Sequence, residues 1–87
     1  MGLGTVELVM EIEDAFGIKI SDERASEVST VRDLARLVES CILEQRGPRA
    51  PTTGVLTHIR WLISIEFGIS MSKVLPESRL QEDLRLD

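Results

Sequence analysis

LGTVELVMEIEDAFG, residues 3–17, carries the clearest structural signal in this 87-residue sequence. Leu8, Ile12 and Phe16 recur at every fourth position, so they fall on one side of a helix and form an apolar stripe. The glycine that follows them is typical of the residue just past a helix end. The pattern therefore predicts an amphipathic helix over 3–16.

Two more helices are predicted between this stretch and the middle of the chain. Ser21 is suited to cap a short helix over 22–27. A longer helix is predicted over 30–45, because Thr30 can act as its N-cap with Asp33 three residues later. The apolar residues of this longer helix keep the helical spacing, so one of its faces should join the core.

The stretch GPRAPTTG at 47–54 is the only clear linker, with two glycines and two prolines in eight residues. A further helix is predicted over 55–67, with Gly68 to end it. The remainder, 69–87, is loop-like because a proline and several serines interrupt it. Four apolar positions are spaced to anchor this loop to a core: Val74 or Leu75, Leu80, Leu84 and Leu86.

Composition places the chain among small, soluble, single-domain proteins. A hydrophobic content of 43% and a charged content of 29% are ordinary for a folded domain of this length. Apolar runs stay well short of the roughly 20 residues that cross a bilayer, so we expect no membrane span. A single cysteine cannot form an internal disulfide, and the cytoplasm is therefore the expected compartment.

Acidic residues are concentrated in the first half of the sequence. The whole chain has a net charge of −5, and residues 1–46 hold ten acids against five bases, while the rest is balanced. An acidic half of this kind disfavours a nucleic-acid partner and favours a basic protein surface. The chain also has no tyrosine and few aromatic residues with which to stack bases.

Several segments together resemble an acyl carrier protein, in rotated order. LGTVELVM at 3–10 and FGIKISD at 16–22 are similar to that family's second helix and the loop after it, and VSTVRDL at 28–34 to the start of its last helix. FGI at 67–69, PESRL at 76–80 and EDLRLD at 82–87 are similar to the end of its first helix and its long loop.

The resemblance implies one acyl-carrier-like domain over 1–87. Residues 1–46 correspond to the family's second half, 47–54 to a linker, and 55–87 to its first helix and long loop. The implied fold is an all-α bundle of three main helices and one short helix, with circularly permuted connectivity. Eight linker residues reach up to about 28 Å, which is enough to join two neighbouring helix ends. A domain-swapped homodimer is the rival arrangement, because prolines stiffen the linker.

The family's attachment site is altered in this sequence. The family carries phosphopantetheine on the serine of an Asp-Ser-Leu motif at the head of its second helix. Asp87 and Leu3 match the two flanking residues, and Gly2 takes the place of the serine. The resemblance therefore implies a carrier-like domain without the cofactor. The alternative is a genuine acyl carrier protein of fatty-acid or polyketide synthesis whose attachment site is altered or truncated.

The exposed side of the first helix is the predicted partner-binding site. Val6 and Met10 lie one turn apart and off the apolar stripe, and acids surround them. An apolar pair within an acidic ring suits a basic, partly apolar partner, and the resemblance implies docking on acyl-transferring or synthase enzymes. The alternative is an ordinary solvated face. The predicted residues are Val6, Glu7, Met10, Glu11, Glu13 and Asp14.

The remaining chemistry-bearing residues give weaker signals. Cys41 lies on the apolar side of its helix and is expected to be buried. His58 has no acid, cysteine or second histidine at ligand spacing, so no metal site is predicted. Trp61 fits either the border of the core or a surface contact. With no nucleophile–His–acid set and no glycine-rich phosphate loop, the chain is not expected to be an enzyme.

Overall fold

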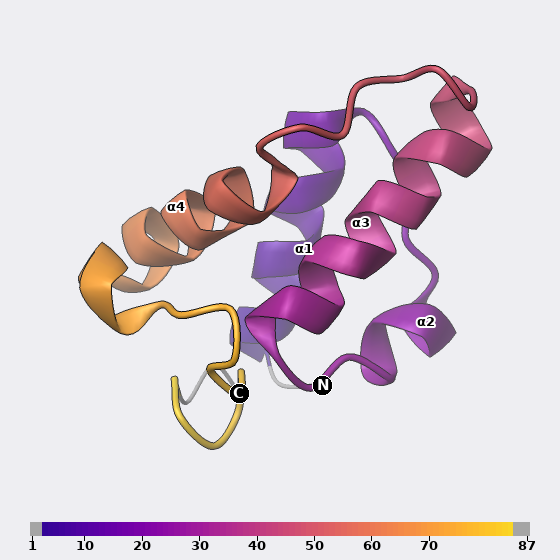
Figure 1. Ribbon diagram of the computed structural model, residues 1–87. Helices are drawn as coiled ribbons and strands as arrows, with labels where there is room; N and C mark the ends of the chain where they lie inside the picture. Colours follow the sequence, from indigo (N-terminus) through magenta and orange to yellow (C-terminus); the bar gives the residue numbers. More distant parts are fainter. Residues whose placement is uncertain (1–2, 85–87) are drawn as a thin grey trace.

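The computed structural model describes residues 3–84, with side chains from Val6 onward, as an all-helical bundle (Figure 1). These residues also include one isolated antiparallel β-bridge, between Thr30 and Arg79. In chain order the elements are α1 (Leu3–Phe16), α2 (Asp22–Ser26), α3 (Val31–Arg46), α4 (Val55–Phe67) and the 3-10 turn η1 (Met71–Lys73). The four predicted helices are confirmed, with ends that differ from the predicted ones by at most one residue.

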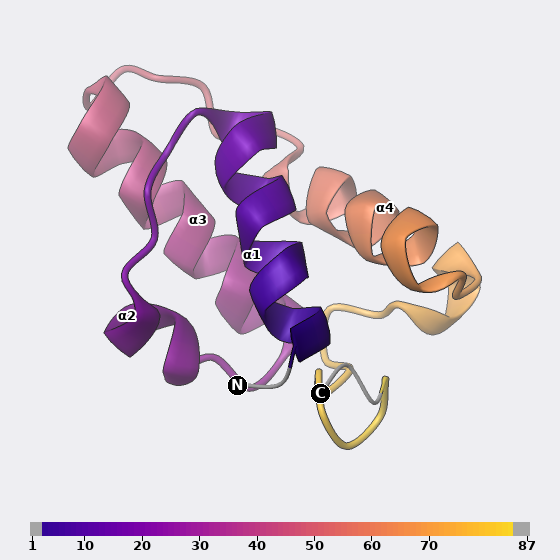
Figure 2. The same ribbon diagram turned by 180° about the vertical axis from the view of Figure 1, so that it is seen from behind.

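A single core lies between α1, α3 and α4. Leu8 and Ile12 of α1 are fully buried, as the apolar stripe predicts, and Ile59 and Ile63 of α4 are buried with them. Figures 1 and 2 show α4 crossing the bundle against α1 and α3. Phe16, the last member of the stripe, is only partly buried at the end of α1. Because α4 packs through these buried isoleucines, the first and second halves of the chain share one core.

The start of α3 is held by the predicted capping box. The Asp33 amide donates to Thr30 Oγ1 at 3.0 Å, and the Thr30 amide donates to Asp33 Oδ2 at 3.2 Å. The Ser29 amide also donates to Asp33 Oδ2 at 3.2 Å. The hydrogen bonds from the Ser29 and Thr30 amides stabilise the Asp33 carboxylate and lower its pKa. The capping box fixes where α3 begins.

Three consecutive residues in the last turn of α3 hold the α1–α2 connection. Gln45 exchanges two hydrogen bonds of 2.7 Å with the backbone of Lys19. Glu44 receives two from the Arg24 guanidinium, at 2.8 and 3.2 Å, and Arg46 donates to the Phe16 carbonyl at 3.0 Å. These bonds fix the position of α2 although the helix has only five residues.

The segment after η1 returns to the start of α3. The Val31 amide donates to the Ser78 carbonyl at 3.0 Å, and the Leu80 amide donates to the Ser29 carbonyl at 2.8 Å. Figures 1 and 2 both place this segment at the end of the bundle where α1 begins. The loop is therefore a structured part of the bundle, and α1, α3 and the loop meet at one pole.

The anchoring of this loop was predicted correctly in part. Val74 and Leu80 are buried, and Leu84 packs against the core. Of the adjacent pair Val74 and Leu75, Val74 is the anchor, and Leu75 is 43% exposed. It directly follows Val74, whose side chain takes the buried position instead. Leu86 lies outside the described residues.

Candidate interaction surface and pocket

The outer side of α1 combines exposed apolar and acidic side chains. Val6 and Met10 are 38% and 59% exposed, and Glu7, Glu11 and Asp14 are exposed around them. The geometry follows from the helical repeat, because residues three and four apart share one side while Leu8 and Ile12 occupy the other. The six residues predicted from the sequence thus belong to α1, and five of them are open to solvent.

Glu13 differs from the other acids of α1. Its side chain is half-buried, and its Oε2 accepts a hydrogen bond of 2.7 Å from the Ile20 amide. This bond ties the end of α1 to the strand-like link that leads to α2. Glu13 therefore has a structural contact that the helical repeat could not reveal, and the freely exposed acids of this surface are Glu7, Glu11 and Asp14.

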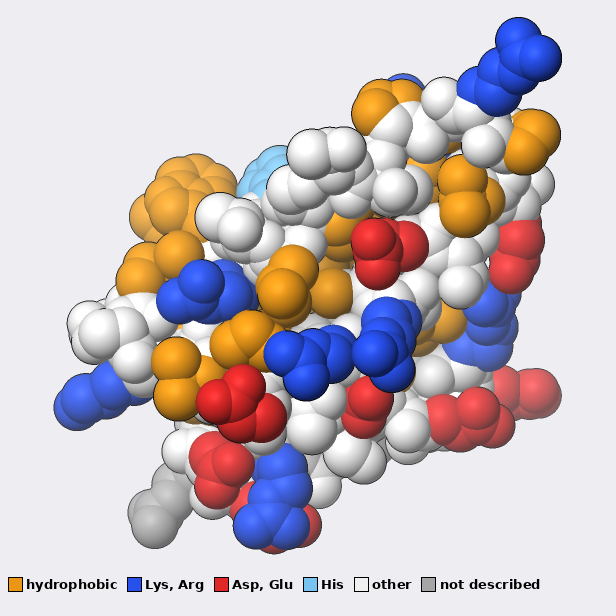
Figure 3. Space-filling view, in the orientation of Figure 1, with side chains coloured by type: hydrophobic (Ala, Val, Ile, Leu, Met, Phe, Trp, Pro, Cys, Tyr) orange, Lys and Arg blue, Asp and Glu red, His pale blue; other side chains and the backbone are white. Residues whose placement is uncertain are grey.

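The charged residues of α1 are all acidic, because its sequence holds four acids and no base. Figure 2 looks onto α1, and Figure 3 shows the opposite side of the bundle, where Lys and Arg lie among Asp and Glu. A net negative potential at α1 attracts basic partners toward that side in particular.

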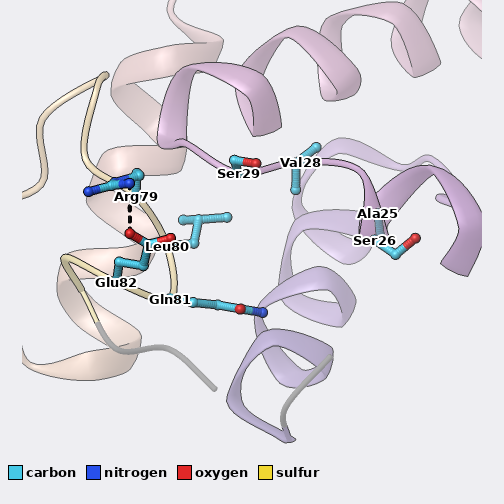
Figure 4. Close-up of a pocket in the computed structure, with 8 residues that line it drawn as sticks. All are labelled: Ala25, Ser26, Val28, Ser29, Arg79, Leu80, Gln81 and Glu82. Atoms are coloured by element: carbon cyan, nitrogen blue, oxygen red, sulfur yellow. Dashed lines mark ion pairs between the residues drawn. The ribbon is translucent and has the colours of Figure 1, made fainter.

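A pocket of about 190 Å³ opens where the α2–α3 connection meets the returning loop (Figure 4). Its apolar walls come from Ala25, Val28 and Leu80. Ser26 and Ser29 lie on one side, and the other side holds Arg79, which forms an ion pair with Glu82 at 2.7 Å. The pocket is thus lined by three apolar side chains and by polar ones that include an exposed ion pair.

Sequence reasoning missed this pocket, because two segments about 50 residues apart form it. Residues 29–31 pair with residues 78–80 in the structure. The pocket could have been located from this pairing, but no sequence pattern indicates it. Each segment alone has an ordinary explanation as a cap or a loop, so neither indicates a cavity.

The other residues considered in the sequence analysis are a cysteine, a histidine and the two residues at the predicted attachment position. Cys41 is fully buried, as predicted, and burial raises the pKa of its thiol. His58 is exposed, with its ring 4.8 Å from Phe16 and 6.1 Å from Trp61, measured between centroids. Within residues 3–84, no group of three His, Cys, Asp or Glu residues is arranged to hold a metal ion. Gly2 and Asp87, at the predicted attachment position, lie outside the described residues.

Comparison with known proteins finds similar proteins for about half of the chain. Residues 3–38 match a family model described as "Phosphopantetheine attachment site". "Acyl carrier protein 5, chloroplastic" of Arabidopsis thaliana is 46% identical over 43 residues, which cover 49% of this chain and 31% of that protein. This part of the chain is similar to the acyl carrier protein family.

Further relatives match the same share of the chain. "Acyl carrier protein 1, chloroplastic" of Casuarina glauca is 44% identical over 45 residues, covering 52% of this chain and 33% of that protein. "Acyl carrier protein 4, chloroplastic" of Cuphea lanceolata is 44% identical over 45 residues, covering 52% of this chain and 32% of that protein. The matched segments therefore span about a third of the lengths of these relatives. No solved structure matches the chain.

On the structure, the match to the acyl carrier family covers α1, α2 and the first half of α3. It includes the acidic surface of α1 and one wall of the pocket, which Ala25 and Val28 form. The relatives named above are acyl carrier proteins, which is consistent with the prediction that this chain is not an enzyme. None of the described helices is long and apolar enough to cross a membrane.

The family model that matches is described as a phosphopantetheine attachment site, so the serines of this sequence are the residues to consider as attachment points. None of its serines stands between an aspartate and a leucine. The two serines at the pocket have other surroundings, since Ser26 donates to the Glu23 carbonyl at 2.7 Å and Ser29 lies beside the α3 cap. We therefore assign no phosphopantetheine-dependent step to these residues.

Proposed function

We propose that this chain is an acyl-carrier-like interaction module that binds a basic protein surface through α1 and does not carry phosphopantetheine. The observation that supports the proposal is the exposed side of α1, where Val6 and Met10 lie among Glu7, Glu11 and Asp14. The acids around this apolar pair attract a basic partner at long range, and the pair itself forms a contact from which water is excluded. Similarity to the acyl carrier protein family favours acyl-transferring or synthase enzymes as the partners.

The proposal includes the assignment of 55–87 as the family's first helix and long loop, joined in permuted order. The burial of Ile59 and Ile63 in the same core as Leu8 supports a closed bundle within one chain. The hydrogen bonds between the returning loop and the start of α3 support it further. A swapped dimer would use the same contacts between two chains, so its test is the mass of the protein in solution.

The first prediction concerns the acidic side of α1. The probe is a dye-labelled helical peptide with arginines on one face and leucines on the other. Changing both Glu7 and Glu11 to lysine should weaken binding about tenfold at low salt, because two attractive charges become repulsive. The effect should fade as salt rises, since exposed charges are screened beyond about 10 Å at 0.1 M. Fluorescence polarisation measures the affinity.

A matched control uses the same change in net charge elsewhere. Glu66 and Glu77 are exposed on α4 and on the returning loop, and changing both to lysine should leave the affinity within about twofold, as for charges away from the contact. Equal losses from the two double variants would mean that only net charge matters, and the α1 surface would be rejected.

The second prediction concerns loading. Incubation with a phosphopantetheinyl transferase and coenzyme A should leave the protein at its unmodified mass, because no serine stands in the required context. Intact-mass spectrometry measures this, with an ordinary acyl carrier protein as the positive control. A modified species that maps to any serine of this chain would contradict the proposal.

A genuine acyl carrier with an altered attachment site is the second candidate. The observation that favours it is the pocket beside α2, whose apolar floor of Ala25, Val28 and Leu80 could receive the start of an alkyl chain. Loading of the chain in the mass experiment would select this candidate. The pathway would then be lipid or polyketide synthesis. The compartment stays a prediction, although the relatives named above are chloroplast proteins.

A further inference from the structure

The β-bridge at the pole has an aspartate on each of its two sides. The amides of the bridged pair, Thr30 and Arg79, donate to side chains of their own segments and not across the bridge. The Thr30 amide donates to Asp33 Oδ2 at 3.2 Å, and the Arg79 amide donates to Asp83 Oδ2 at 2.8 Å. Each side of the bridge is therefore shaped by a carboxylate three or four residues further along the chain.

Asp33 acts on the residue that receives the returning loop. It accepts a second bond, from the Ser29 amide at 3.2 Å, and the carbonyl of the same Ser29 accepts the Leu80 amide across the bridge at 2.8 Å. Hydrogen bonds to an ionised carboxylate are stronger than those between neutral groups. The charge of Asp33 therefore stabilises the backbone on which the loop closes.

The ionisation of Asp33 is coupled to this closed geometry. The bonds from the Ser29 and Thr30 amides lower its pKa, with a smaller contribution from the charge of Arg36, while burial opposes the shift. Because the pKa is lowered in the folded state, the carboxylate stabilises closure above the ordinary aspartate pKa of about 3.9. That contribution is lost as the pH falls below this value.

On the loop side, the charges next to Asp83 come from its own turn. Arg79 pairs with Glu82 at 2.7 Å and with Asp83 at 3.9 Å, and the Asp83 side chain is 49% exposed. A single amide bond and this exposure give Asp83 a weaker hold than Asp33 has. The other charged residues that the structure describes in the segments at this pole are Glu27, Arg32 and Glu77.

The bridge also closes one side of the pocket. Ser29, Arg79 and Leu80 line it, and the Leu80 side chain is buried. Figure 4 shows the α2–α3 connection and the returning loop on opposite sides of the pocket. Separation of the two segments would therefore withdraw Leu80 and open the pocket toward the core.

We propose that Asp33 and Asp83 form a carboxylate latch, in which each aspartate holds one side of the bridge and loss of either negative charge releases the returning loop. The latch involves neither docking by α1 nor loading, so it goes beyond the proposed function. The helices stay together when it opens, because they pack through their own buried apolar residues. Acid therefore opens this end of the bundle before the rest.

The first experiment uses the full chain and measures each substitution on the opposite segment. At about pH 6, Asp33→Asn should speed exchange of the Leu80 amide about tenfold, and Asp83→Asn should speed exchange of the Val31 amide about threefold. The effects differ because Asp33 accepts two amide bonds and Asp83 accepts one. Asp14→Asn, at an exposed aspartate of α1, should leave both rates within about twofold. NMR measures exchange residue by residue.

An acid titration tests the latch in the unaltered protein. Thr30 and Arg79 are the closely spaced pair of an antiparallel bridge, so an NOE is expected between their Hα atoms. This NOE should disappear between about pH 4 and pH 2, while the helical circular dichroism keeps most of its amplitude. In the double variant Asp33→Asn/Asp83→Asn, the NOE should already be weak at about pH 6.

Either of two results would overturn the latch. If a single variant exchanges the opposite segment's amide at the normal rate, its aspartate only caps its own turn. If the NOE and the helical signal disappear together in acid, the whole bundle unfolds at once and has no separate latch. Should the double variant fail to fold, the single variants and the titration of the unaltered protein still decide between these outcomes.

Discussion

Ile59→Ala should lower the free energy of unfolding by about 2–5 kcal/mol, the range for removing most of a buried aliphatic side chain. Ile59 is fully buried in α4, and the cavity would open in the core that α4 shares with α1 and α3. Such a loss is a large part of the 5–15 kcal/mol that typically stabilises a small domain. Urea unfolding followed by circular dichroism measures it.

Ile65→Ala is the matched control for this experiment, because it makes the same change in the same helix at a side chain that is 63% exposed. Its effect should stay within about 0.5 kcal/mol, as for surface substitutions. Similar losses at both positions would mean that α4 does not pack on the core through Ile59. If instead Ile59→Ala destabilised α4 alone and left a second unfolding transition for α1 to α3, the two halves would not share one core.

Arg60→Met should cost about 1.5–3 kcal/mol, the usual net value of hydrogen bonds made by a charged group. The Arg60 guanidinium donates through Nε to the Val74 carbonyl and through Nη2 to the Met71 carbonyl, the latter at 3.0 Å. Methionine keeps most of the aliphatic stem and loses both bonds. The loop around η1 would then be held by the burial of Val74.

Two further variants identify the cause of this loss. Arg60→Lys keeps the charge but cannot reach both carbonyls with a planar fork, so an intermediate loss is expected. Arg36→Met, at an exposed arginine of α3, should change stability by less than about 0.5 kcal/mol. Equal stability of Arg60→Met and Arg60→Lys would show that the paired donors, and not charge alone, hold the loop. The free energy of unfolding is again measured in urea.

The helices could be predicted because their signals are local. The stripe of Leu8 and Ile12, and the pair of Thr30 with Asp33, each lie within one or two helical turns, and the structure places them as expected. The exposure of Val6 and Met10 followed from the same repeat. Local periodicity was therefore sufficient for the elements and for the exposed side of α1.

The rest depended on contacts between distant residues. The hydrogen bond between Glu13 and the Ile20 amide, the pocket between α2 and the returning loop, and the ring contact of His58 with Phe16 all join separate elements. The sequence left Val74 and Leu75 as alternatives, because hydrophobicity alone does not say which of two adjacent apolar residues is buried. Trp61 could not be assigned for a related reason, since its exposure is decided by how α4 rotates against the core.

The pairing of the returning loop with the start of α3 also bears on the order in which the chain folds. The Leu80 amide bonds the Ser29 carbonyl, so closing this contact confines a loop of about 50 residues. Closing the loop costs chain entropy, and the contacts that compensate this cost form only once α3 and α4 already lie together. We therefore expect α1 to α4 to assemble first and the pole with the pocket to form last. In the native protein, that pole should correspondingly be the first region to open and to exchange its amide hydrogens with solvent.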